Sequence, residues 1–489
     1  MQGNNQSRCF PRLFTRKSKR NDSLASTSTI VDEPEPLSPS DTFVEKHDQA
    51  LHSTCLCSGP WTYPSHESPT KDRGYSLNED PLLHPDIVNT IHATIDQLSP
   101  SLRQLSIDIW DHPEHGFEER YAHDVLTRYI AGQGFTVTKH YLGMDTAWRA
   151  EYSRGKGGRV IGVNSEMDAL PGLGHACGHN LIAVSGIAVA VALKAAIDKH
   201  NVSARIILLG TPAEEFGGGK IRLLERGAYK EMDVCVMSHP GPGKPNGAQL
   251  QPWMALQNIE IEFTGHSAHA AFAPWEAQNA LDAAFLAYSS ISVLRQQIKP
   301  TCRVHGIVTG RDWEPNVIPD YAKMRWIVRA PTFAEVESLR ARVTACFEAA
   351  ALATGCKLDL KLGEAYHDVR QSPVLGDEFA RILNRHLGMT TTISDVTLGA
   401  SSDWGLVSYT IPSIQPVVNV QIQPNGGNHT PQFAETARTP ESHEASMKVA
   451  KGLAMTAFRV IDDQAFFHQV KQRFEEDRKH LPQPPSRKT

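Results

Sequence analysis

The chain has 489 residues, which at roughly 150 residues per domain allows about three domains, or two with insertions and tails. Lys and Arg total 49 against 54 Asp and Glu, a formal net charge of -5, and this excludes the basic excess typical of nucleic-acid-binding proteins. Eight cysteines are too few for a disulfide-stabilised scaffold of this length, so free thiols in a reducing compartment are expected. No apolar run reaches the roughly 18 residues of a membrane span, and we expect no membrane partner.

Residues 1–75 have the composition of a disordered tail. Six of the first 20 residues are basic and none is acidic, and a Ser/Thr run and an acidic, Pro-rich stretch follow. Low hydrophobicity with segregated charge cannot offset the entropy lost on folding. The basic start also resembles a mitochondrial transit peptide, although Pro11 interrupts the helix that such a peptide needs. We therefore expect a cytoplasmic protein, with mitochondrial targeting as the alternative.

From residue 84 onward, the pattern predicts an α/β domain. Ile87, Ile91 and Ile95 recur at helical spacing. Strands are then predicted at 159–163, 205–209 and 233–237, with a buried helix at 182–197 that Asn180 caps. The pattern resumes later with a helix at 379–387, a strand at 416–420 and a helix at 442–461. This alternation predicts a mostly parallel sheet in a catalytic domain of two parts, residues 80–253 and 367–465. A charged C-terminal tail, 466–489, is expected to fray after Asp462.

The segment between the two parts, residues 254–366, has a different order of elements. Strands are predicted at 259–263, 302–308, 322–328 and 357–362, and helices at 277–294 and 333–352. The order βαββαβ is that of a ferredoxin-like module of about 100 residues. The sequence therefore predicts one α/β domain interrupted by an inserted four-stranded module.

The densest chemical signal is the segment GHACGHN at 174–180, which precedes the buried helix. A thiolate at Cys177 and an imidazole at His179 can face one metal ion at the entry to a helix, and the glycines allow the tight turn. The alternative interpretation of this segment alone is a buried cysteine beside histidines that cap the helix.

Four further features favour a metal site. Asp168 follows a predicted strand, where a carboxylate can orient a ligand. Glu214 and Glu215 follow another predicted strand, and one carboxylate can bind a metal while the other takes a proton from metal-bound water. His239 and His429 supply imidazoles in later loops. We expect these side chains to meet at one edge of the parallel sheet, where open α/β folds bind ligands.

These motifs resemble the aminoacylase-type dinuclear metallopeptidases (metallopeptidase family twenty), in the amidohydrolase branch. The similarity covers about residues 80–465 and is closest to the β-alanyl-lysine dipeptidase and aminobenzoyl-glutamate hydrolase group. The segments that carry it are EMDALPGLGHACGHN at 166–180, TPAEEFGGGK at 211–220, MSHPGP at 237–242, FTGHSAHAAFAPWEAQNALDA at 263–283, PNVIPDYAKMRWIVRA at 315–330 and NHTPQFA at 428–434.

The resemblance implies a pair of divalent metal ions, zinc or manganese or else cobalt. The implied ligands are Cys177, His179, Glu215, His239 and His429. Cys177 would bridge the ions as a thiolate, Glu214 would be the general base, and Asp168 would hold a ligand in register. Many relatives have a ligand histidine at the position of Glu166, and His175 has no family role, so we expect it to be structural.

For the inserted module, the resemblance implies a lid and a homodimer formed through residues 254–366. His269 matches the residue donated across the dimer to stabilise an oxyanion, and Asn316 and Arg329 match positions that bind the substrate carboxylate. An exposed strand cation is the alternative for Arg329. One departure is Trp404, which follows Asp403 where relatives have Met; if that loop lines the pocket, the tryptophan changes its shape.

The function predicted from these residues is metal-dependent hydrolysis of an amide or peptide bond in a small substrate. The substrate is a dipeptide, an N-acyl amino acid or an aminobenzoyl-glutamate-like compound, and the ligand set does not separate the three. Two alternatives are a catalytically inactive metal-binding scaffold and a hydrolase with Cys177 as nucleophile beside His175 or His179.

Overall fold

The computed structural model describes residues 83–479, so the predicted disordered tail lies outside the described residues. The main sheet of the catalytic part has six strands in the order β1-β2-β4-β3-β5-β13. Strands β4, β3, β5 and the edge strand β13 are parallel, and β1 and β2 add an antiparallel edge on the other side. The strands are β1 Thr136–Lys139, β2 Trp148–Arg154, β3 Arg159–Glu166, β4 Ala204–Thr211, β5 Val234–Val236 and β13 Ser413–Ile414. The predicted mostly parallel catalytic domain is confirmed.

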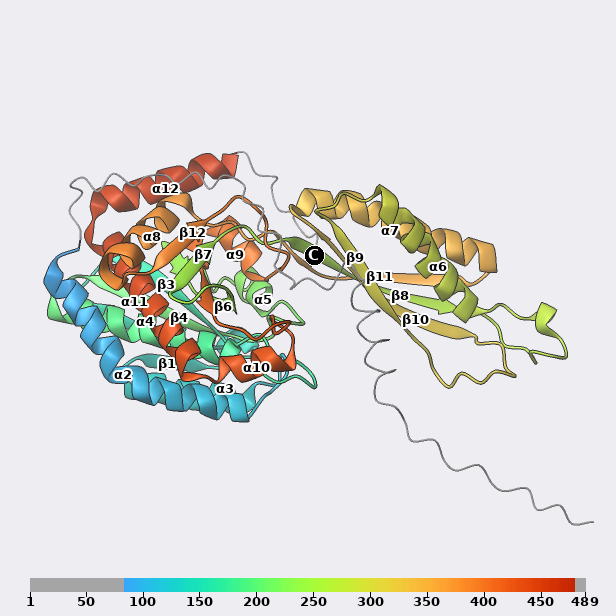
Figure 1. The fold of residues 1–489 in the computed structure, drawn as a ribbon, viewed down its shortest axis with the longest axis horizontal. Coiled ribbons are helices and arrows are strands. Elements are labelled where there is room, and N and C mark those ends of the chain that lie inside the picture. The colour runs from blue at the N-terminus through green and yellow to red at the C-terminus, as the bar shows by residue number, and fades with distance from the viewer. Residues whose placement is uncertain (1–82, 480–489) are drawn as a thin grey trace, which may run out of the picture. The chain divides into compact units, whose positions relative to one another are not determined.

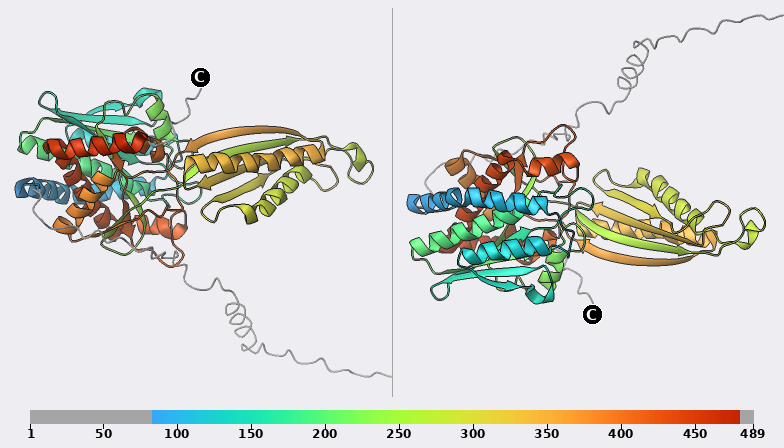
Figure 2. Two further views of the ribbon diagram at one scale, coloured as in Figure 1. Left: turned by 90° about the horizontal axis from the view of Figure 1, so that it is seen from above. Right: turned by 90° about the horizontal axis from the view of Figure 1, so that it is seen from below.

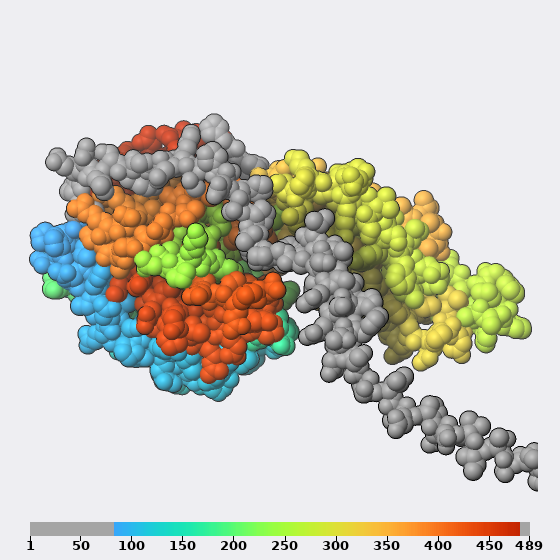
Figure 3. Space-filling view, in the orientation of Figure 1, coloured from blue at the N-terminus to red at the C-terminus, as the bar shows by residue number. Residues whose placement is uncertain are grey.

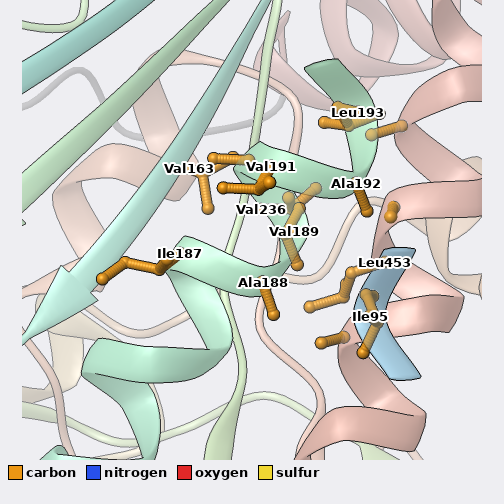
Figure 4. Close-up of a cluster of buried hydrophobic side chains, with 14 of the residues drawn as sticks. Ile95, Val163, Ile187, Ala188, Val189, Val191, Ala192, Leu193, Val236 and Leu453 are labelled. Carbon is orange, nitrogen blue, oxygen red and sulfur yellow. The ribbon is translucent and has the colours of Figure 1, made fainter. Parts of the chain in front are cut away.

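The predicted buried helix is α4, His179–Lys199, at the centre of the catalytic part. It packs against α2 (Pro85–Asp111), α11 (Pro440–Asp462) and β3 (Figure 1). The close-up in Figure 4 shows how Val163, Val236 and Leu453 surround its apolar side chains. Among the described residues, only α4 has the length and composition of a membrane span, and 89% of that stretch is buried inside the protein. The burial of α4 on every side explains why its residues are apolar all round.

A second, four-stranded sheet was not predicted from the sequence. Its order is β12-β7-β14-β6, with β6 His239–Pro242, β7 Gly247–Leu250, β12 Thr390–Ile393 and β14 Val417–Val420. On the face shown in Figure 3, the segment around β7 lies beside the orange segment that contains α8 (Pro373–Leu387) and β12. The strand predicted at 416–420 is β14, whereas β6, β7 and β12 have only four residues each and no period-two pattern that could be recognised.

The inserted module is ferredoxin-like, as predicted. Its elements are β8 Ala255–Thr264, α6 Ala280–Leu294, β9 Arg303–Thr309, β10 Tyr321–Ala330, α7 Phe333–Thr354 and β11 Lys357–Tyr366. The strands form an antiparallel sheet in the order β11-β8-β10-β9, and α6 and α7 cover one face of it (Figure 2). The module has its own hydrophobic core, built around Phe263, Trp326 and Phe347.

Two local expectations are wrong. Asn180 does not cap α4: Gly178 is the N-cap, and the Asn180 amide donates instead to Ser106 Oγ at 3.0 Å and to Ala437 O at 3.1 Å. The chain also does not fray directly after Asp462, because α12 spans Gln464–Lys479. Its Phe466 and Val470 are buried against the core, so two apolar residues in a charged segment are enough to dock the helix.

Candidate active site

The GHACGHN segment turns sharply into α4. Gly178 has a φ of 79°, and a Cβ there would lie 2.5 Å from Cγ of Pro240, so only glycine fits. The turn places the Cys177 side chain beside the start of β6, with Sγ 3.4 Å from Nε2 of His239. His179 is the first residue of α4 and is fully buried.

The predicted ligands converge. The side chains of Cys177, His179 and His239 form one group whose potential ligand atoms all lie within 4.8 Å of one another, and those of Cys177, Glu215 and His429 form a second. A third group joins His179 to Glu166 and Glu214. The Cys177 thiol is thus shared by two adjacent groups, which is the arrangement that a bridging ligand requires. His239 begins β6, and His429 lies in the loop after β14, and both strands belong to the second sheet. The expectation that all ligands follow strands of one sheet is therefore wrong for these two residues.

Asp168 holds two of these residues in place. Its Oδ1 lies 3.0 Å from Nδ1 of His179, and its Oδ2 accepts the backbone N–H of Glu215 at 3.0 Å. A carboxylate at Nδ1 fixes the proton there, so that the Nε2 lone pair of His179 is directed at the ligand groups. Asp168 is buried, and these two contacts link it to the ligand groups.

The ligand groups bring three acidic side chains close together, those of Glu166, Glu214 and Glu215. Burial and then the charges of Glu166 and Glu215 raise the pKa of Glu214. Burial and then the charge of Glu215 raise the pKa of Cys177, and burial lowers the pKa of His239 to about 4. A neutral imidazole and a concentration of negative charge are both suited to divalent cations, which stabilise a deprotonated thiol by their own charge.

A buried ion network beside the site was not assigned from the sequence. Nζ of Lys220 lies 2.7 Å from Oε1 of Glu166 and 2.5 Å from Oδ1 of Asp403, and all three side chains are fully buried. The backbone N–H of Lys220 also donates to Asp403 Oδ2 at 2.8 Å. Lys220 directly follows the glycines of the TPAEEFGGGK segment, and its type alone gave no signal that it would be buried.

The donor set fits metal ions. Among the described residues, the buried Nε2 of His179 has no hydrogen-bond partner, and it lies 3.3 Å from Oε2 of Glu166, which has none either; both side chains belong to one ligand group. Buried polar atoms without partners are costly, and a bound cation satisfies them. Cysteine, imidazole and carboxylate together accept several transition metals.

The structure separates the predicted substrate residues into two places on the inserted module. Arg329 on β10 donates to Ser401 Oγ at 2.8 Å. Burial lowers its pKa, and the charges of Glu214 and Glu215 oppose that shift. Arg329 is half-buried and hydrogen-bonded to Ser401, so it is not the freely exposed strand cation of the alternative interpretation.

His269 and Asn316 lie together elsewhere, because the Ala270 N–H donates to Asn316 O at 3.0 Å. His269 is exposed, and within the described chain no hydrogen bond or ion pair joins it to the ligand groups. Its Nδ1 accepts the backbone N–H groups of Ala271 and Phe272, at 3.2 and 3.1 Å. The ring proton is consequently on Nε2, which is free to donate.

Two further residues belong to the protein interior. Trp404 begins α9 (Trp404–Thr410) and is fully buried in a hydrophobic cluster with Tyr229 and Trp253, so it fills the core and does not line an open pocket. His175 is buried, and burial followed by the charge of His179 lowers its pKa to about 3. An imidazole that stays neutral in this way fits the structural role expected for it.

Comparisons with known proteins agree with this geometry. Residues 255–355 match the family model of the peptidase dimerisation domain found in M20 peptidases. The chain is 41% identical to the Xaa-Arg dipeptidase of Mus musculus over 396 residues, which cover 78% of this chain and 90% of the relative. It is 31% identical to a p-aminobenzoyl-glutamate hydrolase chain of Escherichia coli, over 56% of this chain and 61% of that protein. Its fold matches a dinuclear metal-binding M20 peptidase from Bacillus subtilis, with a TM-score of 0.53, 20% identity and coverage of 72% and 98%.

The fold and the site together define a metal-dependent hydrolase that cleaves amide or peptide bonds in small substrates. The chain belongs to the M20 metallopeptidase family, in its amidohydrolase branch, which confirms the resemblance seen in the sequence.

Proposed function

We propose that this chain is a dipeptidase that hydrolyses Xaa-Arg and related dipeptides with a basic second residue. The observation that carries the proposal is the 41% identity to the mouse Xaa-Arg dipeptidase across 90% of that protein. The convergent ligand groups support it, because a scaffold without activity would be free to lose Glu214, which is present here with its neighbours.

The chain's own residues suit this chemistry. Cys177, His179, Glu215, His239 and His429 would hold two divalent ions, which when bound lower the pKa of water and polarise a carbonyl. Glu214, whose pKa burial and neighbouring carboxylates raise, takes the proton of the attacking water and passes it to the leaving amine. Asp168 keeps His179 and Glu215 in register through its two carboxylate oxygens.

The inserted module would complete the site in a homodimer formed through residues 254–366. His269 offers an Nε2 proton as a hydrogen-bond donor, yet no contact links it to its own chain's ligand groups among the described residues. Donation to the oxyanion in the other protomer explains both facts. Arg329 and Asn316 would bind the substrate carboxylate, for which the planar guanidinium of Arg329 is suited.

The metal would be zinc or manganese, with cobalt as a further candidate, because a mixed sulfur, nitrogen and oxygen donor set accepts each of them. We propose a cytoplasmic enzyme, with mitochondrial import through the basic N-terminus as the alternative. Fractionation of cells that express a C-terminally tagged full chain separates the two compartments.

The test is a substrate panel run with each metal. β-Alanyl-arginine, β-alanyl-lysine, N-acetyl amino acids and p-aminobenzoyl-glutamate are incubated with protein loaded with zinc, manganese or cobalt, and with chelated protein. We expect the highest kcat/KM on the basic dipeptides and loss of activity on chelation. Faster cleavage of p-aminobenzoyl-glutamate than of the basic dipeptides would contradict the proposed substrate class. Activity that survives chelation but is lost on alkylation would favour Cys177 as a nucleophile.

A further inference from the structure

The two adjacent glutamates of the site lie on a turn, residues 212–218, between the end of β4 and the start of α5 (Gly219–Glu225). Ala213, the residue before Glu214, has a φ of 54°. A side chain with a Cβ in this left-handed region costs about 1–2 kcal/mol, and such residues persist only where their surroundings hold them.

At the start of the turn, the anchor is Glu119. Its Oε1 accepts the backbone N–H of Ala213 at 2.7 Å, and its Oε2 accepts the Thr146 hydroxyl at 2.7 Å. Glu119 is fully buried. Burial, followed by the charge of Asp168, raises its pKa to about 7, so the fold keeps this carboxylate inside at a cost in free energy.

Helix capping does not explain why Glu119 is there. It occupies the N-cap position of α3 (Arg120–Gly132), yet its side chain makes no capping hydrogen bond. Glu114 supplies that function, since its two carboxylate oxygens accept the N–H groups of Tyr121 and Ala122 at 2.9 and 3.0 Å. The Glu119 carboxylate is thereby directed at Ala213.

At the end of the turn, the anchor is Tyr366, the last residue of β11. Its hydroxyl donates to Glu214 O at 2.8 Å and accepts the N–H of Gly218 at 3.0 Å, and the side chain is buried. One phenol thus joins the beginning and the end of the segment that carries Glu214 and Glu215.

The loop that precedes Glu119 is fitted closely to the same turn. A Cβ added at Gly116 would lie 2.8 Å from the Cβ of Ala213 and 3.2 Å from Phe216 O. Phe117 also has a positive φ, of 66°, and its ring lies against Gly217. The turn is therefore held by backbone contacts and by the two side-chain anchors, with no room to shift toward this loop.

From this geometry, we propose that Glu119 and Tyr366 are positioning residues, which hold the strained turn so that Glu214 and Glu215 face the ligand groups. The proposal rests on the proposed metal-dependent function. Asp168 holds the middle of the turn through the Glu215 N–H, and Glu119 and Tyr366 hold its two ends.

The test uses the full-length chain and measures metal binding directly. The variants are Tyr366→Phe, Glu119→Ala and the conservative Glu119→Gln, whose amide oxygen can still accept the Ala213 N–H while its NH2 donates to Thr146. Tyr152→Phe is the matched control, because the Tyr152 hydroxyl also makes two hydrogen bonds, both to Asp198 and at a distance from the turn. Metal affinity and stoichiometry come from competition with a chromophoric chelator, and Tm is measured in parallel.

We expect Tyr366→Phe and Glu119→Ala to bind the more weakly held ion about 10–100-fold less tightly, the usual loss when a residue that orients a ligand is removed. In both variants kcat should fall more than KM rises, whereas Glu119→Gln should restore metal affinity to within roughly three-fold of wild type. Lower Tm with unchanged metal affinity in both variants, as expected for Tyr152→Phe, would overturn the proposal.

Failure of the proposed substrate is distinguishable, because a wild-type chain that binds metal but cleaves no dipeptide still reports on the two anchors. If the wild-type chain binds none of the metals, both the positioning role of Glu119 and Tyr366 and the proposed metal-dependent function are wrong.

Discussion

Lys220 and Glu166 form a buried ion pair immediately beside the ligand groups, with Nζ 2.7 Å from Oε1 and both side chains fully buried. Lys220 also pairs with Asp403, and its charge lowers the pKa of Glu214 against the raising effect of burial. A protein cation thus balances carboxylates at a position where many family members have a ligand histidine.

The Lys220→Met variant should be strongly destabilised. Removing the ammonium leaves Glu166 and Asp403 buried and unpaired, a situation that costs about 3–5 kcal/mol. Urea unfolding followed by circular dichroism measures the loss. Lys139→Met is the matched control, because Lys139 pairs with Asp124 at 2.8 Å on the surface, where such pairs contribute about 1 kcal/mol or less. Equal losses in the two variants would contradict the role assigned to the buried pair.

Asp168→Asn should weaken metal binding about 10–100-fold. The Asp168 carboxylate accepts from both His179 Nδ1 and the Glu215 N–H, whereas an amide can accept from only one of them and turns its NH2 toward the other. Calorimetric titration of metal into the apo protein measures the effect. Asp198→Asn, a change of the same kind far from the ligand groups, should bind metal as wild type does. Unchanged affinity in Asp168→Asn would show that His179 and Glu215 hold their positions without it.

Glu214→Gln should retain metal and lose roughly 10²–10⁴-fold in kcat, the usual contribution of a general base. The amide keeps the shape of the side chain but cannot take a proton from water. Elemental analysis confirms that metal is bound, and initial rates on the best dipeptide give kcat. Near-normal turnover in this variant would exclude Glu214 as the base.

His269→Ala should be inactive alone and active in mixed dimers with Glu214→Gln. In one of the two sites of such a heterodimer, an intact Glu214 meets an intact His269 from the other protomer, so up to about half of the activity per dimer returns. Activity of the two purified variants is compared before and after their protomers are exchanged. If mixing restores nothing, while size measurements prove that exchange occurred, His269 acts within its own chain or takes no part.

Acidification should destabilise the catalytic part through His443. Burial, with a contribution from the charge of Arg103, lowers the pKa of this histidine to about 4. Its Nε2 lies 3.1 Å from Ser99 O, and its buried Nδ1 has no hydrogen-bond partner for a second proton within residues 83–479.

Because the folded pKa lies below the unfolded value near 6.5, the unfolded chain binds the proton first, and stability falls as the pH drops from about 6.5 toward 4. Above that range, neither state is protonated and His443 has no effect. Urea unfolding at pH 7.5 and pH 5 should therefore show a smaller loss of stability for His443→Gln than for wild type. Parallel losses would assign the acid sensitivity to other groups.

Local sequence patterns were sufficient for most of the fold. The alternation at 259–263 and 357–362 identified β8 and β11, and the apolar run after His179 identified α4, because these patterns reflect which face of each element is buried. In the second sheet, only β14 was predicted, at 416–420, and the short strands β6, β7 and β12 escaped detection; α12 was mistaken for a fraying tail. Helix α12 is held in place because Phe466 and Val470 pack against the core. That contact joins residues distant in sequence, so no local pattern reveals it.

The candidate site divides in the same way. Its chemistry could be identified from residue type and motif, since Cys177, His179, Glu215, His239 and His429 were all recognisable in the sequence, and the structure brings them into adjoining groups. The residues that support these ligands became visible only in the folded chain. Lys220, Glu119 and Tyr366 carry no motif, because their roles depend on burial and on contacts with segments up to 183 residues away along the chain. Trp404 shows the converse, because the sequence made it a candidate for the pocket wall and packing placed it in the core.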